Sequence, residues 1–158
     1  MRRSSRLVVV ALLVGIGLLP SLGASAMIKR SLEQLSREAD LILLGSVTKQ
    51  VSAWNDQHTA IHTDVTVAVE EAIKGSPGEE MTLRVSGGSV GDIGMRTSTD
   101  PVFQEGELVI VFLTTGVVPA RVAGHFQGKY TVQNGTVIRD GQREPVARFT
   151  DAIRAASR

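Results

Sequence analysis

Three apolar segments of this chain share one layout, in which an apolar run stops at a marked turn. They are residues 39–47 (ADLILLGSV), 65–75 (VTVAVEEAIKG) and 103–113 (FQEGELVIVFL). Short apolar runs that are rich in β-branched residues and bounded by glycine are typical of β-strands. Together the segments predict a mainly β fold, organised as a small and strongly curved β-barrel. They do not name a reaction.

The chain begins with the layout of a secretory signal. Three arginines among the first six residues form a basic start, residues 7–19 form an uncharged apolar run, and residues 24–26 (Ala-Ser-Ala) form a small-residue cleavage site. The apolar run is shorter than the roughly 20 residues that a membrane-spanning helix needs. We therefore expect residues 1–26 to be a signal peptide. Residues 27–158 should then form a single exported domain without a stable membrane span, in the periplasm or outside a bacterial cell. A signal that is kept as a membrane anchor is the alternative.

Removal of the signal would change the net charge of the chain. All 16 acidic residues but only 14 of the 17 basic residues follow residue 26, so the formal charge would fall from +1 to −2. A mildly acidic domain is poorly suited to nucleic acid, whose phosphates require clustered Lys and Arg, so we expect no nucleic-acid partner. The chain also has no cysteine, which excludes a disulfide framework and thiolate chemistry.

A short helix should open the domain. Ser31 and Gln34 have the spacing of a capping box, in which each side chain accepts a hydrogen bond from the backbone amide of the other residue, so a helix should follow over residues 32–39. At the other end of the chain, residues 146–156 have the apolar spacing of a short closing helix.

The first strand should be long and bent. Residues 41–44 are continuously apolar, as in a strand that is buried on both faces, and Gly45 should mark a bulge or sharp bend. Beyond Gly45 the alternation places Val47, Val51 and Ala53 on one face and the polar residues Ser46, Thr48, Gln50 and Ser52 on the other.

The remaining strands follow from alternation and turn chemistry. Residues 61–73 give the clearest alternation, residues 81–85 form a third strand, and residues 107–113 read as a central strand. Residues 87–106 form a long glycine-rich connection, and Pro119 suits an edge strand over residues 117–123 because proline cannot donate to a ladder. Asn134-Gly135 predicts an additional hairpin between residues 130–133 and 136–138.

The order of these features resembles that of the netrin-like domains, the group that contains the tissue inhibitors of metalloproteinases. The resemblance covers about residues 31–114 and lies on Ala39-Asp40, Gly45, Val47, Val69, Lys74-Gly75, Phe103, Gly106 and Leu113. Small exported bacterial proteins of unassigned function look similar across nearly the whole mature chain. The resemblance implies an OB-like, five-stranded Greek-key barrel, here with an extra hairpin and flanking short helices. An immunoglobulin-like β-sandwich is the alternative, since several short strands suit both folds.

The resemblance does not carry the inhibitor function with it. Animal inhibitors of this family place an N-terminal cysteine on the zinc of the protease, whereas the mature chain would begin at Met27 and contains no cysteine.

Two stretches between the strands hold the candidate contact residues. Trp54 is the only tryptophan and precedes a turn-like stretch, and an exposed tryptophan often anchors an interface; a plug at the barrel end is the alternative. The glycine-rich stretch 87–94 lacks the helix and the lysine of a phosphate-binding loop, so it is either a partner-contacting loop or a plain connection. The candidate partner-contact residues are Trp54, Asn55, Asp56, His58, His62, Gly87, Gly88 and Asp92.

Catalytic and metal-binding patterns are weak. His58 and His62 are four residues apart, a spacing that covers roughly 13 Å along a strand and is too long for one metal ion. His125 lies in a turn-like stretch with no partner evident in the sequence. We therefore expect no metal, no cofactor and no catalytic residue.

These features favour a non-enzymatic binding or interaction module of the bacterial envelope. Its partner should be a protein, and an exported protease is one candidate. A metalloprotease inhibitor that acts through its loops and a small hydrolase stay open as alternatives.

Overall fold

The computed structural model describes residues 28–139 and 141–158. The predicted signal peptide lies outside these residues, so it stays a prediction. None of the helices within the described part of the chain is long and apolar enough to cross a membrane.

Short helices stand at both ends of a chain that is otherwise mainly β. The helices are α1 (Leu32–Glu38), the 3₁₀ helix η1 (His125–Gly128) and α2 (Val146–Ala156). The strands are β1 (Leu41–Trp54), β2 (Ile61–Lys74), β3 (Glu80–Ser86), β4 (Gly88–Val90), β5 (Ile93–Met95), β6 (Leu108–Thr114), β7 (Arg121–Val122), β8 (Lys129–Gln133), β9 (Thr136–Arg139) and β10 (Gln142–Pro145). The mainly β fold and the two flanking α-helices are therefore confirmed.

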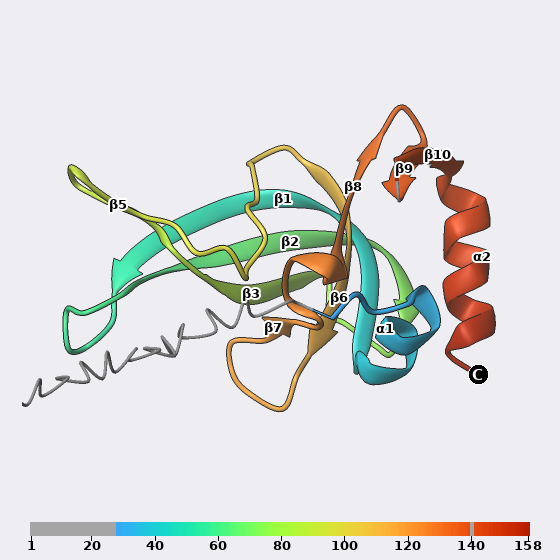
Figure 1. Cartoon of the computed structure of the whole chain (residues 1–158), viewed down its shortest axis with the longest axis horizontal. Coiled ribbons are helices and arrows are strands. Elements are labelled where there is room, and N and C mark those ends of the chain that lie inside the picture. Colours follow the sequence, from blue (N-terminus) through green and yellow to red (C-terminus); the bar gives the residue numbers. More distant parts are fainter. Residues whose placement is uncertain (1–27, 140) are drawn as a thin grey trace, which may run out of the picture.

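Eight of the strands form one antiparallel sheet (Figure 1). Its order is β10-β9-β8-β6-β1-β2-β3, with β7 paired to β6, while β4 and β5 form a separate two-stranded hairpin. The predicted central position of β6 is confirmed, because β6 pairs with both β1 and β8. This single pairing path differs from the two facing sheets of an immunoglobulin-like sandwich.

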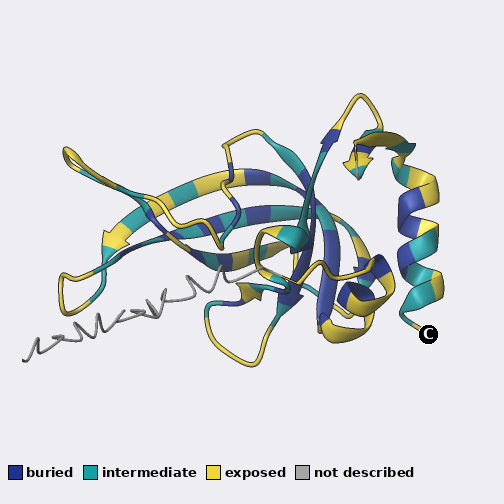
Figure 2. Cartoon of the chain, viewed as in Figure 1, coloured by how far each residue is buried: buried dark blue, intermediate teal, exposed yellow. Residues whose placement is uncertain are grey.

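The continuous apolar runs of β1 and β6 are explained by two separate cores, one on each face of the sheet. Leu43 on β1 and Val111 on β6 belong to the core enclosed by the curved strands. Their neighbours Ile42 and Phe112 point the opposite way, into the core beneath the two helices, where they pack with Phe149 of α2. Figure 2 shows the resulting dark bands of buried residues along the strands and on the inner side of α2. A strand buried on both faces needs apolar residues at every position, which accounts for the sequence pattern.

Gly45 stands at the predicted bulge. The β1–β2 register shifts between Leu44 and Gly45, and a Cβ atom at Gly45 would overlap the carbonyl oxygen of Ala68 on β2. Glycine therefore allows β1 and β2 to approach where β1 bends.

A bulge within β1 itself corrects the predicted faces of this strand. Val47 lies opposite Val67 and Lys49 lies opposite Thr66, so Thr48 is an extra residue in β1. One extra residue exchanges the two faces of everything beyond it. Val51 is consequently 48% exposed and Ala53 is also exposed, although alternation places both on the same face as the buried Val47. The even-numbered residues from Gln50 to Trp54 face inward instead.

The chain between β3 and β8 departs furthest from the sequence predictions. The glycine-rich connection contains the β4–β5 hairpin, which alternation did not reveal because each strand has only three residues. The predicted edge strand over residues 117–123 is reduced to Arg121–Val122, which pairs with β6. Just before it, Ala120 forms an isolated parallel bridge with Leu83 of β3, and the Arg84 amide donates to the Ala120 carbonyl at 2.8 Å.

The turn predictions hold at the β8–β9 hairpin. Asn134 and Gly135 have φ of 51° and 70°, and Gln133 pairs with Thr136 across them. Positive φ at both central residues is what a tight two-residue hairpin turn requires.

Candidate functional site

The outer halves of β1 and β2 and the turn between them, residues 48–66, form an arm of the sheet. The feature most suited to binding is a polar pocket of about 620 Å³ on the inner side of this arm. It lies where the enclosed apolar core ends, between the arm and the segment that leads from β5 to β6. Below it is called the polar pocket, and it is lined by Gln50, Ser52, Thr63, Val85, Ser86, Gly87, Gly88, Ser89, Gly94, Met95, Arg96, Thr97, Asp100, Pro101, Val102 and Phe103. Its volume is within the usual range of small-molecule sites.

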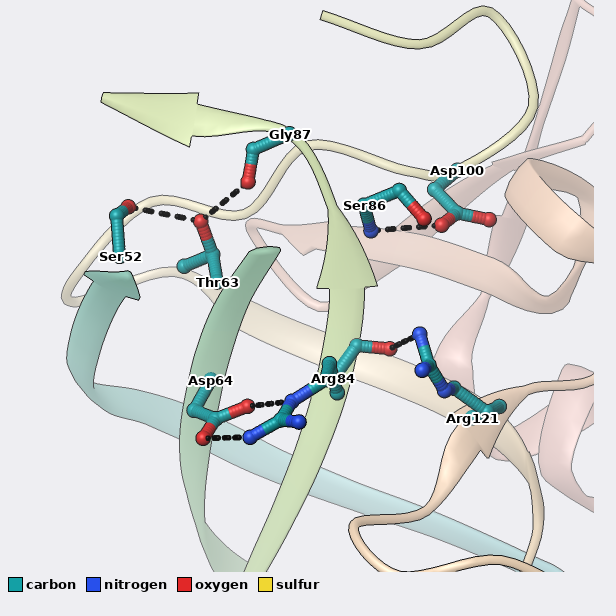
Figure 3. A network of polar contacts seen from close by, with 8 residues as sticks. All are labelled: Ser52, Thr63, Asp64, Arg84, Ser86, Gly87, Asp100 and Arg121. Carbon is teal, nitrogen blue, oxygen red and sulfur yellow. Dashed lines mark hydrogen bonds and ion pairs between the residues drawn. The ribbon is translucent and has the colours of Figure 1, made fainter. Parts of the chain in front are cut away.

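The floor of the polar pocket is a chain of hydrogen bonds between strands (Figure 3). Thr63 is buried, and its hydroxyl donates to the Gly87 carbonyl at 2.7 Å. The Ser52 hydroxyl lies 2.8 Å from the Thr63 hydroxyl and therefore donates to it. A side chain on Gly88 would overlap both hydroxyls, so glycine lets the β4 backbone lie directly on this pair. The two hydroxyls are thereby fixed as lining groups.

A carboxylate holds the opposite wall. Asp100 Oδ2 accepts a hydrogen bond from the Ser86 amide at 2.7 Å, and Asp100 Oδ1 lies 3.6 Å from Nδ1 of His125. Partial burial opposes the charge of Asp100, but the hydrogen bonds from Ser86 and the neighbouring His125 hold the pKa of this carboxyl below its ordinary value. Asp100 is therefore ionised and already engaged at neutral pH.

Outside the pocket, the outer face of β2 and β3 carries an ion pair (Figure 3). Arg84 donates to both carboxylate oxygens of Asp64, at 2.6 and 2.7 Å. This bidentate hydrogen bonding lowers the pKa of Asp64. Arg121 approaches from β7 and donates to the Arg84 carbonyl at 3.5 Å. The group ties β2, β3 and the β7 segment together.

The structure brings the two predicted contact stretches side by side. The Gly87 amide donates to the Ile61 carbonyl at 2.8 Å, and the Ile61 amide lies 3.5 Å from the sulfur of Met95 on β5. Of the predicted contact residues, only Gly87 and Gly88 line the polar pocket itself. Asp92 is exposed in the turn of the β4–β5 hairpin.

The other predicted contact residues lie at the end of the arm. Asn55 organises the turn, because its side-chain oxygen accepts from the Thr59 and Ala60 amides. His58 stacks on Trp54 with ring centroids 6.2 Å apart, while Asp56 beside them is exposed.

The two histidines do not form a joint site. His58 lies in the turn with a φ of 54°, and His62 lies on β2 opposite Ala53. No group of three or more His, Asp or Glu side chains within the described residues is placed to hold a metal ion.

Sequence reasoning missed most of the pocket residues, among them Gln50, Ser52, Arg96 and Asp100. Alternation placed Gln50 and Ser52 on the face opposite Val47, because the extra residue at Thr48 leaves no trace in the apolar pattern. Arg96 and Asp100 lie in a stretch without periodicity, where only the tertiary fold brings them to the pocket.

A larger groove of about 690 Å³ lies beside α1 and η1 and includes the exposed side chains of Phe126 and Ile138. Three of its cations, Arg30, Lys129 and Arg139, pair with glutamates, namely Glu38, Glu107 and Glu144 respectively. These three charges therefore serve the fold, which makes the groove the less suitable binding site.

A scan against protein-family models found no family that matches the chain, and a search of the curated proteins found no match. These two comparisons therefore assign neither a family nor an activity, and the netrin-like resemblance stays a prediction.

Proposed function

We propose that this protein is an exported, non-enzymatic binding module that holds a segment of a protein partner in the polar pocket. Its partner would belong to the bacterial envelope, and an exported protease is one candidate. The observation that carries the proposal is the change of face after the bulge at Thr48, which turns Gln50 and Ser52 toward the pocket.

This change of face matters because the inner side of β1 is apolar before the bulge and polar after it. Up to Val47 the inner residues of β1 are apolar and buried. Beyond the bulge, Gln50 and Ser52 occupy the same face and line the pocket. Polar side chains on this face can exchange hydrogen bonds with a ligand, which an apolar core face cannot do.

An OB-type barrel of the netrin-like kind is the scaffold we infer for this site. Five pairings in a ring support it: β6 with β1, β1 with β2, β2 with β3, Leu83 of β3 with Ala120, and the following β7 with β6. The parallel contact between Leu83 of β3 and Ala120, just before β7, is compatible with a five-stranded Greek-key barrel. In such a barrel the β1–β2 turn lies beside the ligand, where Trp54 and His58 stack.

Binding is favoured over catalysis by the way the pocket hydroxyls are used. Ser52 and Thr63 hydrogen-bond to one another and to the Gly87 carbonyl, and this leaves them as positioned lining groups instead of nucleophiles activated by a base.

Affinity capture from the exported fraction tests the proposal. The wild type is compared with Gln50→Trp, which fills the pocket, and with Lys49→Trp, which places the same side chain one residue earlier on the outer face. One protein, identified by mass spectrometry, should be retained by the wild type and Lys49→Trp and be lost with Gln50→Trp. Equal retention by all three proteins, or retention by none, would contradict the proposal.

A small hydrolase is the second candidate, because the His125–Asp100 pair has the arrangement that orients a general base. Hydrolysis of a panel of p-nitrophenyl esters should then disappear in His125→Ala and persist in His58→Ala. If the wild type hydrolyses these esters no faster than the uncatalysed reaction, the hydrolase candidate is excluded.

A further inference from the structure

We propose that the segment bound in the polar pocket is an extended peptide carrying a carboxylate, and that it adds as a strand to the open edge of β1 at residues 50–54. This inference rests on the proposed function and specifies the chemistry of the partner.

The edge of β1 is open because its two neighbours have different lengths. β6 pairs with β1 only from Leu41 to Ser46, whereas β2 follows β1 as far as Trp54. From the Thr48 bulge onward, one side of β1 therefore lies opposite no strand of the eight-stranded sheet. Figure 1 shows this half of β1 running along the border of the arm, away from β6.

The backbone groups at this edge are oriented outward. The Asn55 amide donates to the Ala60 carbonyl, and antiparallel pairs alternate between hydrogen-bonded and non-hydrogen-bonded positions. Residues 53 and 51 therefore direct their amides to β2, while Gln50, Ser52 and Trp54 direct theirs to the open side. The Gln50 amide confirms this direction, because it donates to the Glu105 carboxylate at 3.0 Å.

Beyond Gln50, the amides of Ser52 and Trp54 point to the same open side of β1. No strand among the described residues pairs with them on this side. Exposed strand edges are templates for an extended peptide, whose main chain supplies matching donors and acceptors. The Glu105 contact shows that this edge already accepts a carboxylate oxygen in place of a strand.

The charge of the pocket selects the side chain of the peptide. Two of its lining residues are charged, Arg96 and Asp100. Asp100 is engaged by Ser86 and His125, whereas the exposed guanidinium of Arg96 forms no ion pair with any described residue. A planar guanidinium binds a carboxylate through two parallel hydrogen bonds. An Asp, a Glu or a C-terminal carboxylate on the bound strand would complement it.

A random dodecapeptide library displayed on phage provides the probe, with the full exported protein as the target. We expect enriched peptides to contain an acidic residue or to present a free C-terminus. Their affinity should fall about tenfold or more in Arg96→Gln, which removes a charge-assisted contact. Arg143→Gln, a change of the same kind at an exposed arginine of β10, should leave affinity within about twofold.

The strand-addition step has its own matched pair of variants. Ser52→Ala and Ser52→Pro both remove the hydroxyl, but only the proline removes the outward amide. Binding should weaken by less than about tenfold in the first, which loses one lining hydroxyl, and be lost in the second. Hydrogen exchange on the wild type tests the same step without the proline variant and so does not depend on whether that variant folds. Peptide binding should slow exchange of the Ser52 and Trp54 amides.

Three results would overturn the inference: no enriched peptide, enriched peptides that bind Arg96→Gln as tightly as the wild type, or bound peptide that leaves both amides unprotected. If any of these occurs while Gln50→Trp still abolishes capture of the envelope partner, the binding function stands and the strand-addition mode is wrong. If capture is also insensitive to Gln50→Trp, both fail.

Discussion

Lys74, at the end of β2, caps the C-terminus of α1 through its contact with Ala39. The Lys74 ammonium donates to the Ala39 carbonyl at 2.6 Å and to the Ser36 carbonyl at 2.8 Å. These carbonyls belong to the last turn of α1 and to its C-cap residue, Ala39, where the helix itself provides no donors. The Lys74-Gly75 pair, which contributes to the netrin-like pattern, therefore joins the helix to the sheet.

Lys74→Met should destabilise the protein by about 1–3 kcal/mol, because several helix carbonyls lose a charged donor. Urea unfolding followed by circular dichroism measures the change. Lys49→Met, at an exposed lysine of β1, serves as the control and should stay within about 0.5 kcal/mol of the wild type. Equal effects of the two substitutions would remove the capping role from Lys74.

Gly45→Ala should lower the free energy of unfolding by about 1–3 kcal/mol, the usual cost of forcing an extra carbon into a packed site. The new methyl would overlap the Ala68 carbonyl oxygen, which is backbone and has little freedom to move. A thermal melt detects the loss. Gly116→Ala is the matched control, since a methyl there meets no atom within 4 Å, and its melting temperature should be unchanged or slightly raised.

Glu107 and Lys129 form an ion pair whose side chains are only 13% and 10% exposed. The carboxylate also accepts a hydrogen bond from Thr131, and the ammonium lies 4.8 Å from the centre of the Phe103 ring. Removal of one charge from such a pair leaves the other buried without its partner, at a cost of about 3–5 kcal/mol.

Glu107→Gln should therefore be strongly destabilising in urea unfolding. The double variant Glu107→Gln with Lys129→Met should recover part of the loss, because no unpaired charge remains. A double variant that is as unstable as the sum of the two single variants would indicate that the pair is energetically uncoupled.

The Asp64–Arg84 pair predicts a loss of stability in acid. The pKa of Asp64 is lowered in the folded protein by its hydrogen bonds from Arg84, so folding favours the ionised carboxyl. This contribution is fully present above the unfolded pKa of about 3.9, and it is lost as the pH falls through the lowered pKa of the folded state.

Asp64→Asn should consequently reduce stability at pH 7 and flatten its decline below about pH 4. Urea midpoints measured from pH 7 to pH 2.5 give the comparison. Asp56→Asn, in the exposed arm turn, should retain the slope of the wild type. A wild-type slope in Asp64→Asn would show that other carboxyls control acid unfolding.

Much of the fold was predictable because its signals are local. The capping box of α1 has both hydrogen bonds, from the Gln34 amide to Ser31 and from the Ser31 amide to Gln34. The Asn134-Gly135 turn has the predicted hairpin around it. Each of these signals depends on residues within a few positions of one another, so the chain around them has little influence.

The candidate site was less predictable because its members are joined across the sheet. The stretches around Trp54 and Gly87 were predicted as separate contact surfaces, and only the pairing of β2 with β3 places them together. Gln50 and Ser52 were assigned to the wrong face, since a single extra residue at Thr48 reverses the alternation without changing the composition.

The sequence by itself determined the long strands β1, β2, β3 and β6, the β8–β9 turn and the need of β1 and β6 for cover on both faces, because apolar periodicity and glycine placement act locally. The tertiary structure alone decided which polar side chains enter the pocket and which strand edge is left open. Those outcomes depend on strand register and on the unequal lengths of β6 and β2 beside β1, quantities that arise only when distant segments pair.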